Sequence, residues 1–125
     1  MTTLPPLTTE VIQSIVDEKL DDETLHQLVW HCLGYRYDEG LKSWNLDLVE
    51  TAWQEKYPEP PKFVDSRHAT VQLTRSIPKE YKQLLKTHLG FKGYSLDQLV
   101  PRLTRRATMA SWLLSYMATN DLLKI

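Results

Sequence analysis

The sequence contains one cysteine, four glycines and two phenylalanines among its 125 residues. The single cysteine, Cys32, allows no disulfide within the chain and no multi-cysteine metal site, as is usual in a reducing compartment. So little glycine excludes a collagen-like or low-complexity chain. Apolar runs such as residues 112–114 are too short to cross a bilayer, and residues 1–6 lack the basic start and apolar stretch of a secretory signal. We therefore expect a cytoplasmic protein with no membrane partner.

The remaining composition is that of one soluble domain, with 42% hydrophobic and 25% charged residues. A chain of this length buries about two-thirds of the surface that its unfolded form exposes, so it can fold alone. Residues 57–61, Tyr-Pro-Glu-Pro-Pro, form a stiff break, but no repeat or flexible linker divides the sequence. We predict a single globular domain over residues 1–125.

Hydrophobic periodicity and helix-cap residues predict a mainly α fold, a compact bundle of about five or six helices. Thr8 and Asp21 are suited to cap helix starts, and Gly34 stands where a left-handed C-cap belongs. The predicted helices cover about residues 8–19, 21–33, 45–57, 78–89 and 101–118, with a short helical turn at 95–98.

Two segments have the pattern of β-structure. Residues 35–37 and 41–44 flank the turn Asp38-Glu39-Gly40, so the sequence allows a small β-hairpin there. Residues 69–74 alternate apolar and polar side chains, which is typical of a strand, but six residues do not separate a strand from an extended loop or a short helix. Any sheet should therefore be minor.

Charge is divided unevenly along the chain. The acidic half, residues 1–60, has 4 basic and 12 acidic side chains and a balance of −8, whereas the basic half, residues 61–125, has 11 and 4 and a balance of +7. The net charge of −1 hides this division. Such asymmetry indicates an interaction surface, or two halves that face each other and neutralise internally. The sequence leaves both interpretations open.

Positive charge gathers at two predicted helix starts, residues 75–79 and 101–106. A helix N-terminus offers unpaired N–H groups and the positive end of the helix dipole, so arginines beside it can complete a seat for phosphate or carboxylate. Cations at the N-terminus of an exposed helix lower its stability by about 0.3–1 kcal/mol each. A negative charge nearby should offset this cost. Either an internal carboxylate, such as Asp17, Asp22 or Glu55, or an external anion would do so.

We expect a non-enzymatic interaction or regulatory protein that binds an acidic protein surface or a phosphorylated ligand through a basic face of its second half. The predicted face consists of Arg75, Lys79, Lys82, Lys86, Lys92, Arg102, Arg105 and Arg106. On the last predicted helix, Met109, Trp112 and Tyr116 continue from Arg105 at helical spacing. This stripe suits contact with a protein partner or with a second copy of the chain, as in a homodimer.

Two other functions remain as alternatives. Residues 79–117 loosely follow a helix-turn-helix pattern, which makes nucleic acid an alternative partner, although a pI near 6.4 and the acidic first half oppose binding of a polyanion. An enzyme whose site is assembled across the fold is less favoured, because hydrolase, kinase, phosphate-loop and dinucleotide-binding signatures are absent.

The histidines and the cysteine do not form a recognisable site. His26 and His31 lie five residues apart, on different faces of one predicted helix, and His68 and His88 have no neighbour at ligand spacing. Cys32 falls on the apolar stripe of its helix, which favours a packed hydrophobic role over a nucleophilic one. We therefore predict no catalytic residue, no metal site and no cofactor.

Five short motifs carry a resemblance to a known family: residues 33–37 (LGYRY), 57–61 (YPEPP), 73–78 (LTRSIP), 89–94 (LGFKGY) and 104–107 (TRRA). In these motifs, and over nearly its whole length, the chain resembles a small family of cyanobacterial proteins with relatives in plant plastids, a domain of unknown function. The resemblance implies a cytosolic protein of a photosynthetic cell. It implies no activity, cofactor or catalytic residue.

Overall fold

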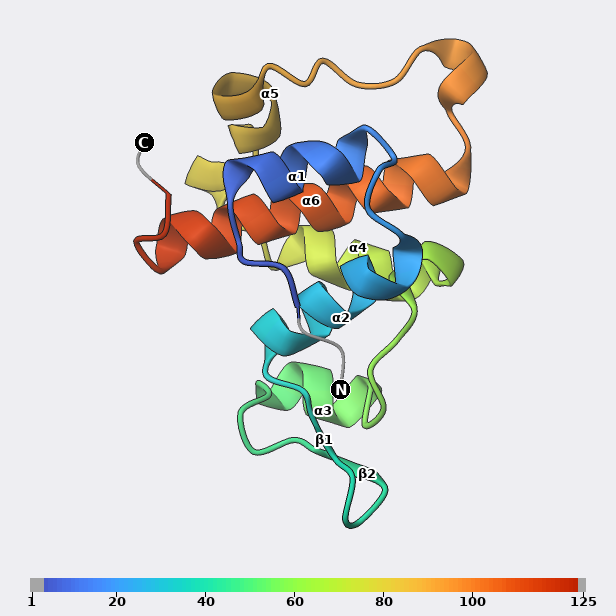
Figure 1. The fold of residues 1–125 in the computed structure, drawn as a ribbon, viewed down its shortest axis with the longest axis vertical. Helices are drawn as coiled ribbons and strands as arrows, with labels where there is room; N and C mark the ends of the chain where they lie inside the picture. The colour runs from blue at the N-terminus through green and yellow to red at the C-terminus, as the bar shows by residue number, and fades with distance from the viewer. Residues whose placement is uncertain (1–3, 124–125) are drawn as a thin grey trace.

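The last helix, α6 (Pro101–Thr119), is the longest element and lies at the centre of the fold. The computed structural model describes residues 4–123, and within them most other elements pack against α6 (Figure 1). The other helices are α1 (Thr9–Val16), α2 (Asp22–Leu33), α3 (Thr51–Lys56), α4 (Arg67–Arg75) and α5 (Leu84–Leu89). Short 3-10 helices cover Phe63–Asp65, Lys79–Tyr81 and Leu96–Gln98. The predicted mainly α fold of about five or six helices is confirmed.

The first two helices begin and end where local rules place them. The Thr8 side chain accepts a hydrogen bond from the Val11 amide at 3.2 Å, and the Asp21 carboxylate accepts one from the Thr24 amide at 2.9 Å. Gly34 ends α2 in the left-handed conformation, with φ of 108°. Its missing side chain matters twice, because a Cβ there would also lie 2.2 Å from the carbonyl oxygen of Leu48. The loop before α3 can therefore pack directly on the end of α2.

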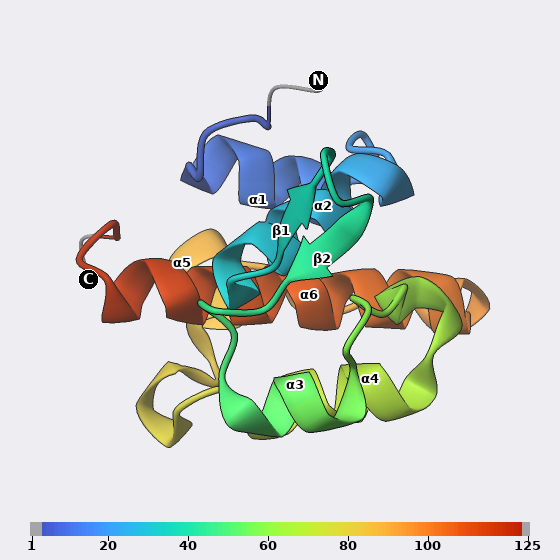
Figure 2. The ribbon, with the colours of Figure 1, turned by 90° about the horizontal axis from the view of Figure 1, so that it is seen from below.

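The core forms around the apolar side of α6. Figure 2 shows α1 on one side of α6 and α4 on the other. Helix α1 contributes Ile12, Ile15 and Val16, and α4 contributes Ala69 and Leu73. The fully buried side chains of α6 recur at steps of three and four residues, which is the pattern of a helix face turned inward.

A small antiparallel hairpin projects from the end of the molecule opposite α5 (Figure 1). Its strands are β1 (Arg36–Asp38) and β2 (Ser43–Asn45), with Tyr37 paired to Trp44. The Trp44 ring meets the rings of Trp30, Tyr35 and Tyr37 edge to face at 5.8, 6.3 and 5.1 Å. These aromatic contacts attach the hairpin to α2, and the predicted hairpin is confirmed.

The structure resolves the ambiguous segment 69–74 as a helix, because these residues belong to α4. Ser66 caps the helix by accepting a hydrogen bond from the Ala69 amide at 3.2 Å. Ala69 and Leu73, four residues apart, are fully buried, so the same two apolar residues satisfy a helix and a strand pattern equally. The tertiary contact with α6 decides for the helix.

Three predicted helix boundaries also change. The segment 45–57 forms helix only from residue 51, because β2 takes residues 43–45 and a loop follows. The segment 78–89 divides into the 3-10 helix Lys79–Tyr81 and α5. The first helix stops at Val16, where the following residues turn back and Glu18 takes a φ of 60°.

Candidate functional site

Arg106 lies inside the protein and not on the predicted basic face. Its side chain is 0% exposed, and its Nη1 atom is 2.6 Å from Oδ1 of Asp22. Its Nη2 atom donates to the carbonyl oxygens of Ile15 and Leu20. The guanidinium thus ties the segment between α1 and α2 to the start of α6, and its proposed role in binding an external anion is wrong.

The position of Arg106 in the sequence indicates that its side chain is buried. Arg106 stands three residues after Leu103, four before Ala110 and seven before Leu113, all of them buried on the inner face of α6. A basic residue on an apolar stripe indicates an internal partner, because a buried charge must be paired. Asp22 is one of the internal carboxylates that the sequence offered for this purpose.

Arg102 is likewise paired within the chain. Its Nε and Nη2 atoms lie 3.0 and 3.1 Å from the two carboxylate oxygens of Asp22, and its Nη1 atom is 2.9 Å from Glu18. Burial alone would raise the pKa of Asp22, but hydrogen bonds from Arg102 and Arg106 outweigh it and lower that pKa below 3.8. Two of the eight predicted cations are therefore paired with two carboxylates of the same chain, Asp22 and Glu18.

The remaining predicted cations do not form one surface. Arg105 is half-buried and donates from Nη1 to the carbonyl oxygen of Val64 at 2.9 Å. Lys92 is exposed on the loop after α5, where the Tyr94 hydroxyl donates to the carbonyl oxygen of Val16 in α1 at 3.1 Å. Helix α4 lies on the other side of α6 (Figure 1). The others, Arg75, Lys79, Lys82 and Lys86, are exposed and make no ion pair with any carboxylate among residues 4–123.

The predicted partner stripe on α6 is mostly core. Met109 is 0% exposed and Trp112 is 8% exposed. The Trp112 indole donates to Oγ of Ser76 at 3.0 Å and stacks on Tyr116 with ring centres 5.7 Å apart. Only Tyr116 keeps part of its surface open, so the stripe is wrong as an exposed contact for a partner.

The elements between α5 and α6 depart from a regular helix-turn-helix pattern. Helix α5 has six residues, and the next helical turn is the 3-10 helix Leu96–Gln98. The start of α6 is joined to α1 and α2 by Arg106 and Arg102, and further along α6 packs against α4 and α5. A recognition helix presents its N-terminal side chains to a groove of the nucleic acid, whereas here Arg106 is buried and Arg102 is held by Asp22 and Glu18.

The structure brings two of the predicted cations, Arg75 and Arg105, together with three basic side chains that the sequence did not single out. A groove of about 940 Å³ between α3 and α4 is lined by Lys56, Arg67, His68 and Arg75, with Glu50 as its only acidic residue. On the other side of α4, a groove of about 400 Å³ toward α6 is lined by Arg67 and Arg105 and by no acidic residue. We call the set Lys56, Arg67, His68, Arg75 and Arg105 the α4 surface. Lys56, Arg67 and His68 were not predicted as part of a basic surface, because the sequence left residues 69–74 open between a strand, an extended loop and a short helix.

Helical spacing would have shown this surface. Arg67, Val71 and Arg75 are four residues apart, so in a helix they share one face, and all three line the groove beside α3. In a strand, their positions would also share a face, but the buried residues Ala69 and Leu73 would then lie on that same face with them. The helix separates the charged residues from the core residues.

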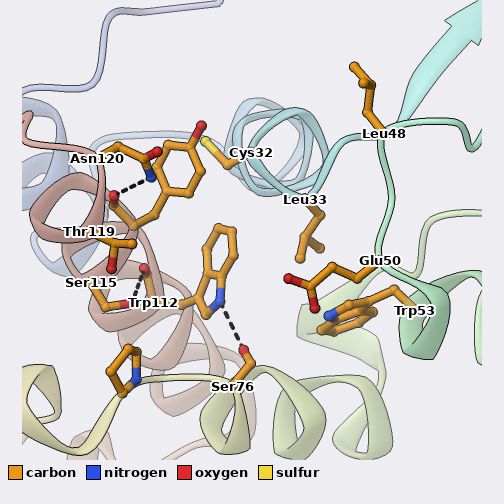
Figure 3. A pocket seen from close by; sticks show the side chains of 12 residues that line it. Cys32, Leu33, Leu48, Glu50, Trp53, Ser76, Trp112, Ser115, Thr119 and Asn120 are labelled. Carbon is orange, nitrogen blue, oxygen red and sulfur yellow. Dashed lines mark hydrogen bonds between the residues drawn. The ribbon is translucent and has the colours of Figure 1, made fainter.

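A smaller cleft of about 350 Å³ lies between α2, α3 and α6 (Figure 3). Tryptophans from two elements border it, Trp53 of α3 and Trp112 of α6, and Glu50 is the only charged residue in its lining. Cys32 also lines this cleft. Burial raises the pKa of its thiol to about 11, so at neutral pH the group is an uncharged packed thiol.

Other titratable groups serve packing. The His26 ring is 3% exposed, lies stacked between Trp30 and Phe63, and its Nε2 atom accepts a hydrogen bond from the Val64 amide at 3.3 Å. Burial lowers its pKa below 6.5. Within residues 4–123, no three histidine, cysteine or acidic side chains are grouped so that they could hold a metal ion. None of the helices in this part of the chain is long and apolar enough to cross a membrane.

Comparison with known proteins identifies relatives without an assigned activity. Residues 6–118 match the model of a family described as a domain of unknown function (DUF1823). A protein with a solution NMR structure is 51% identical, over 97% of this chain and 99% of that chain, with a TM-score of 0.82. No curated protein matches the chain significantly.

Proposed function

The chain belongs to the DUF1823 family, a domain of unknown function, which supplies no activity to carry over. From the structure of the chain we propose that it is a non-enzymatic interaction module. Its α4 surface binds an acidic segment of a partner protein. One observation carries this proposal. Four lysine and arginine side chains line the two grooves beside α4, against the single carboxylate of Glu50. None of the four forms an ion pair within the described part of the chain.

The spacing of these cations favours an extended segment over a small anion. Arg67 and Arg75 stand eight residues apart on one face of α4, which corresponds to about 12 Å along a helix. A phosphorylated small molecule needs cations that converge on one point. An extended chain advances about 3.3 Å per residue, so acidic side chains four positions apart match the two arginines.

The surroundings of α4 extend the positive field without closing the surface. Beyond the end of α4, Lys79 and Lys82 are exposed, with Glu80 between them. Apolar side chains of Val71, Leu99 and Val100 also line the groove toward α6. Complementary charge would steer an acidic segment to the surface, and these aliphatic groups would hold its apolar residues.

Binding of a labelled acidic peptide tests the proposal. The probe is a fluorescent twelve-residue peptide with glutamates at every fourth position, and the measurement is its anisotropy at increasing salt. Reversal of Arg67 and Arg75 to glutamate should weaken binding about 5- to 30-fold, because each exposed ion pair contributes about 0.2–1 kcal/mol and the reversal adds repulsion. Both side chains are exposed, so the variant should fold normally.

The matched control reverses the same number of charges elsewhere. Lys42 of the hairpin turn and Lys92 are exposed and lie outside the α4 surface. Their reversal should change the affinity by about twofold or less at physiological salt, since charges farther away than about 8 Å are screened. Equal losses in the two double variants would contradict the proposal, because they would show attraction to net charge and not to the α4 surface.

A further inference from the structure

Helices α4 and α6 run in the same direction on either side of the groove of about 400 Å³. At one end, Arg105 of α6 donates to the carbonyl oxygen of Val64, just before α4 begins. At the other end, the Trp112 indole of α6 donates to Oγ of Ser76, directly after α4. Both helices therefore begin at the same end of the groove, as Figure 1 also shows.

The two ends of this groove differ in chemistry. Where the helices begin, the lining contains Arg67 and Arg105 together with the aliphatic side chains of Leu99 and Val100. Toward the other end, the lining residues are threonines of the two helices. Positive charge and exposed apolar surface are therefore concentrated at the end where the helices begin.

Leu99 and Val100 are held at the surface by the backbone around them. Leu99 is 52% exposed and Val100 is 45% exposed. Before them, a capping box fixes the turn, since the Gln98 side chain accepts from the Ser95 amide at 3.2 Å and from the Ser95 hydroxyl at 2.8 Å. Directly after Val100, α6 begins. Exposed apolar side chains that are grouped in this way, with polar groups at their rim, mark contact sites.

Carboxylates of the chain do not fill this end of the groove. Asp97 accepts a hydrogen bond from the Ser95 hydroxyl and is not part of the lining. Glu18 and Asp22, near the start of α6, are paired with arginines outside the groove. The two groove arginines make no ion pair within residues 4–123, so their charge is available to an external carboxylate.

An acidic ligand that also carries an apolar side chain fits this end of the groove best. A carboxylate pairs with a guanidinium through charge-assisted hydrogen bonds. An apolar side chain laid on Leu99 and Val100 would remove all three from water, which is favourable in proportion to the area covered. A purely charged ligand, such as the backbone of a nucleic acid, would leave the two aliphatic side chains uncovered.

We propose that the acidic segment of the partner is amphipathic, with a bulky apolar anchor residue that packs on Leu99 and Val100 beside the carboxylate held by Arg67. This inference rests on the proposed function and specifies its partner further. The anchor belongs at the Arg67 end of α4, because Arg75 does not line this groove. Side chains on one face of an extended segment are two residues apart, so the anchor stands two positions beyond the terminal acidic residue.

Anisotropy measurements with three labelled peptides test the inference. The reference peptide has glutamates at every fourth position and alanines elsewhere. The other two carry one leucine, two positions outside the first or the last glutamate, which covers both directions of binding. The better leucine peptide should bind at least about fivefold more tightly than the reference, which corresponds to about 1 kcal/mol. This ratio should persist at high salt while both affinities fall, because salt screens charges and does not weaken an apolar contact.

Matched protein variants locate the anchor. Leu99→Ser combined with Val100→Ser should reduce the ratio to less than about twofold, because the apolar contact is lost. Serine is a favourable helix N-cap at position 100, so this protein should keep its fold, which urea unfolding would establish. Leu41→Ser combined with Leu48→Ser should keep the ratio, since these leucines are 76% and 66% exposed and do not line the groove.

The outcomes separate this inference from the proposed function. Leucine peptides that bind no more tightly than the reference would overturn the amphipathic partner and leave the α4 surface as a site for acidic segments. A ratio that is unchanged when Leu99 and Val100 are replaced would overturn the placement of the anchor. Failure of all three peptides to bind would overturn both proposals.

Discussion

Replacing Asp22 by asparagine should destabilise the fold far more than replacing Glu18 by glutamine, although both carboxylates belong to the same charge network. Asp22 faces the Arg106 guanidinium, whose side chain is 0% exposed, at 2.6 Å. Glu18 contacts Arg102, and both side chains of that pair are nearly half exposed. Loss of a partner from a buried pair costs about 3–5 kcal/mol, whereas an exposed pair contributes about 0–1 kcal/mol.

Asp22→Asn should lower the free energy of unfolding by about 3 kcal/mol, at the lower end of this range, because the Asp22 side chain itself is 31% exposed. Urea unfolding followed by tryptophan fluorescence measures it. With a slope of about 1.5 kcal/mol per molar urea, the midpoint should fall by about 2 M, against less than about 0.7 M for Glu18→Gln. Similar shifts in the two variants would refute the claim that Asp22 compensates a buried charge.

Acidification provides a second readout of the same contact. The folded-state pKa of Asp22 lies below its ordinary value of 3.8, so its stabilising effect is present above pH 4 and disappears as the pH falls through the folded-state pKa. The gap in stability between the wild-type protein and Asp22→Asn should therefore narrow in strong acid. A gap that stays constant from pH 7 to pH 2 would contradict an ionic origin.

Three other predictions concern single side chains. Burial lowers the pKa of His26 below 6.5, so between the folded-state and unfolded-state pKa values the unfolded protein binds a proton that the folded protein does not. The free energy of unfolding should therefore fall as the pH drops below about 6.5. His26→Gln should flatten this pH dependence, measured by urea titrations from about pH 7.5 to 5. Gly34→Ala should lower the free energy of unfolding by more than about 3 kcal/mol in thermal unfolding, because the added Cβ clashes with Leu48 and the residue has a positive φ. Gly90 also has a positive φ but open space around it, so Gly90→Ala should cost only about 1–2 kcal/mol. The Cys32 thiol, with its pKa raised to about 11, should react with a thiol reagent at pH 8 about 100-fold more slowly in the native protein than in urea.

Short-range rules account for the parts of the fold that the sequence predicted well. The caps at Thr8 and Asp21 and the left-handed Gly34 depend on hydrogen bonds and backbone preferences within a few residues. The segment 69–74 was ambiguous for a physical reason: its alternation is compatible with a strand, and the contact of α4 with α6 that makes it a helix is formed between distant parts of the chain.

The candidate site was harder to predict, because the charge of a residue does not determine whether its side chain points to the surface or into the core. Arg105 and Arg106 are neighbours in sequence, yet one reaches the carbonyl oxygen of Val64 near the surface and the other is enclosed with Asp22. The phase of the helix separates them, since consecutive residues point about 100° apart. Arg67 was not predicted for a different reason: the sequence did not identify the helix to which it belongs.

The central claim is that the cations around α4, and not those at the start of α6, receive an acidic partner. Titration of the ¹⁵N-labelled protein with the acidic peptide, followed by amide chemical shifts, tests it most directly. The account predicts that the largest shifts lie in residues 67–75 and weaken together as salt is added. Largest shifts in residues 101–106, or small shifts spread evenly over the chain, would contradict it.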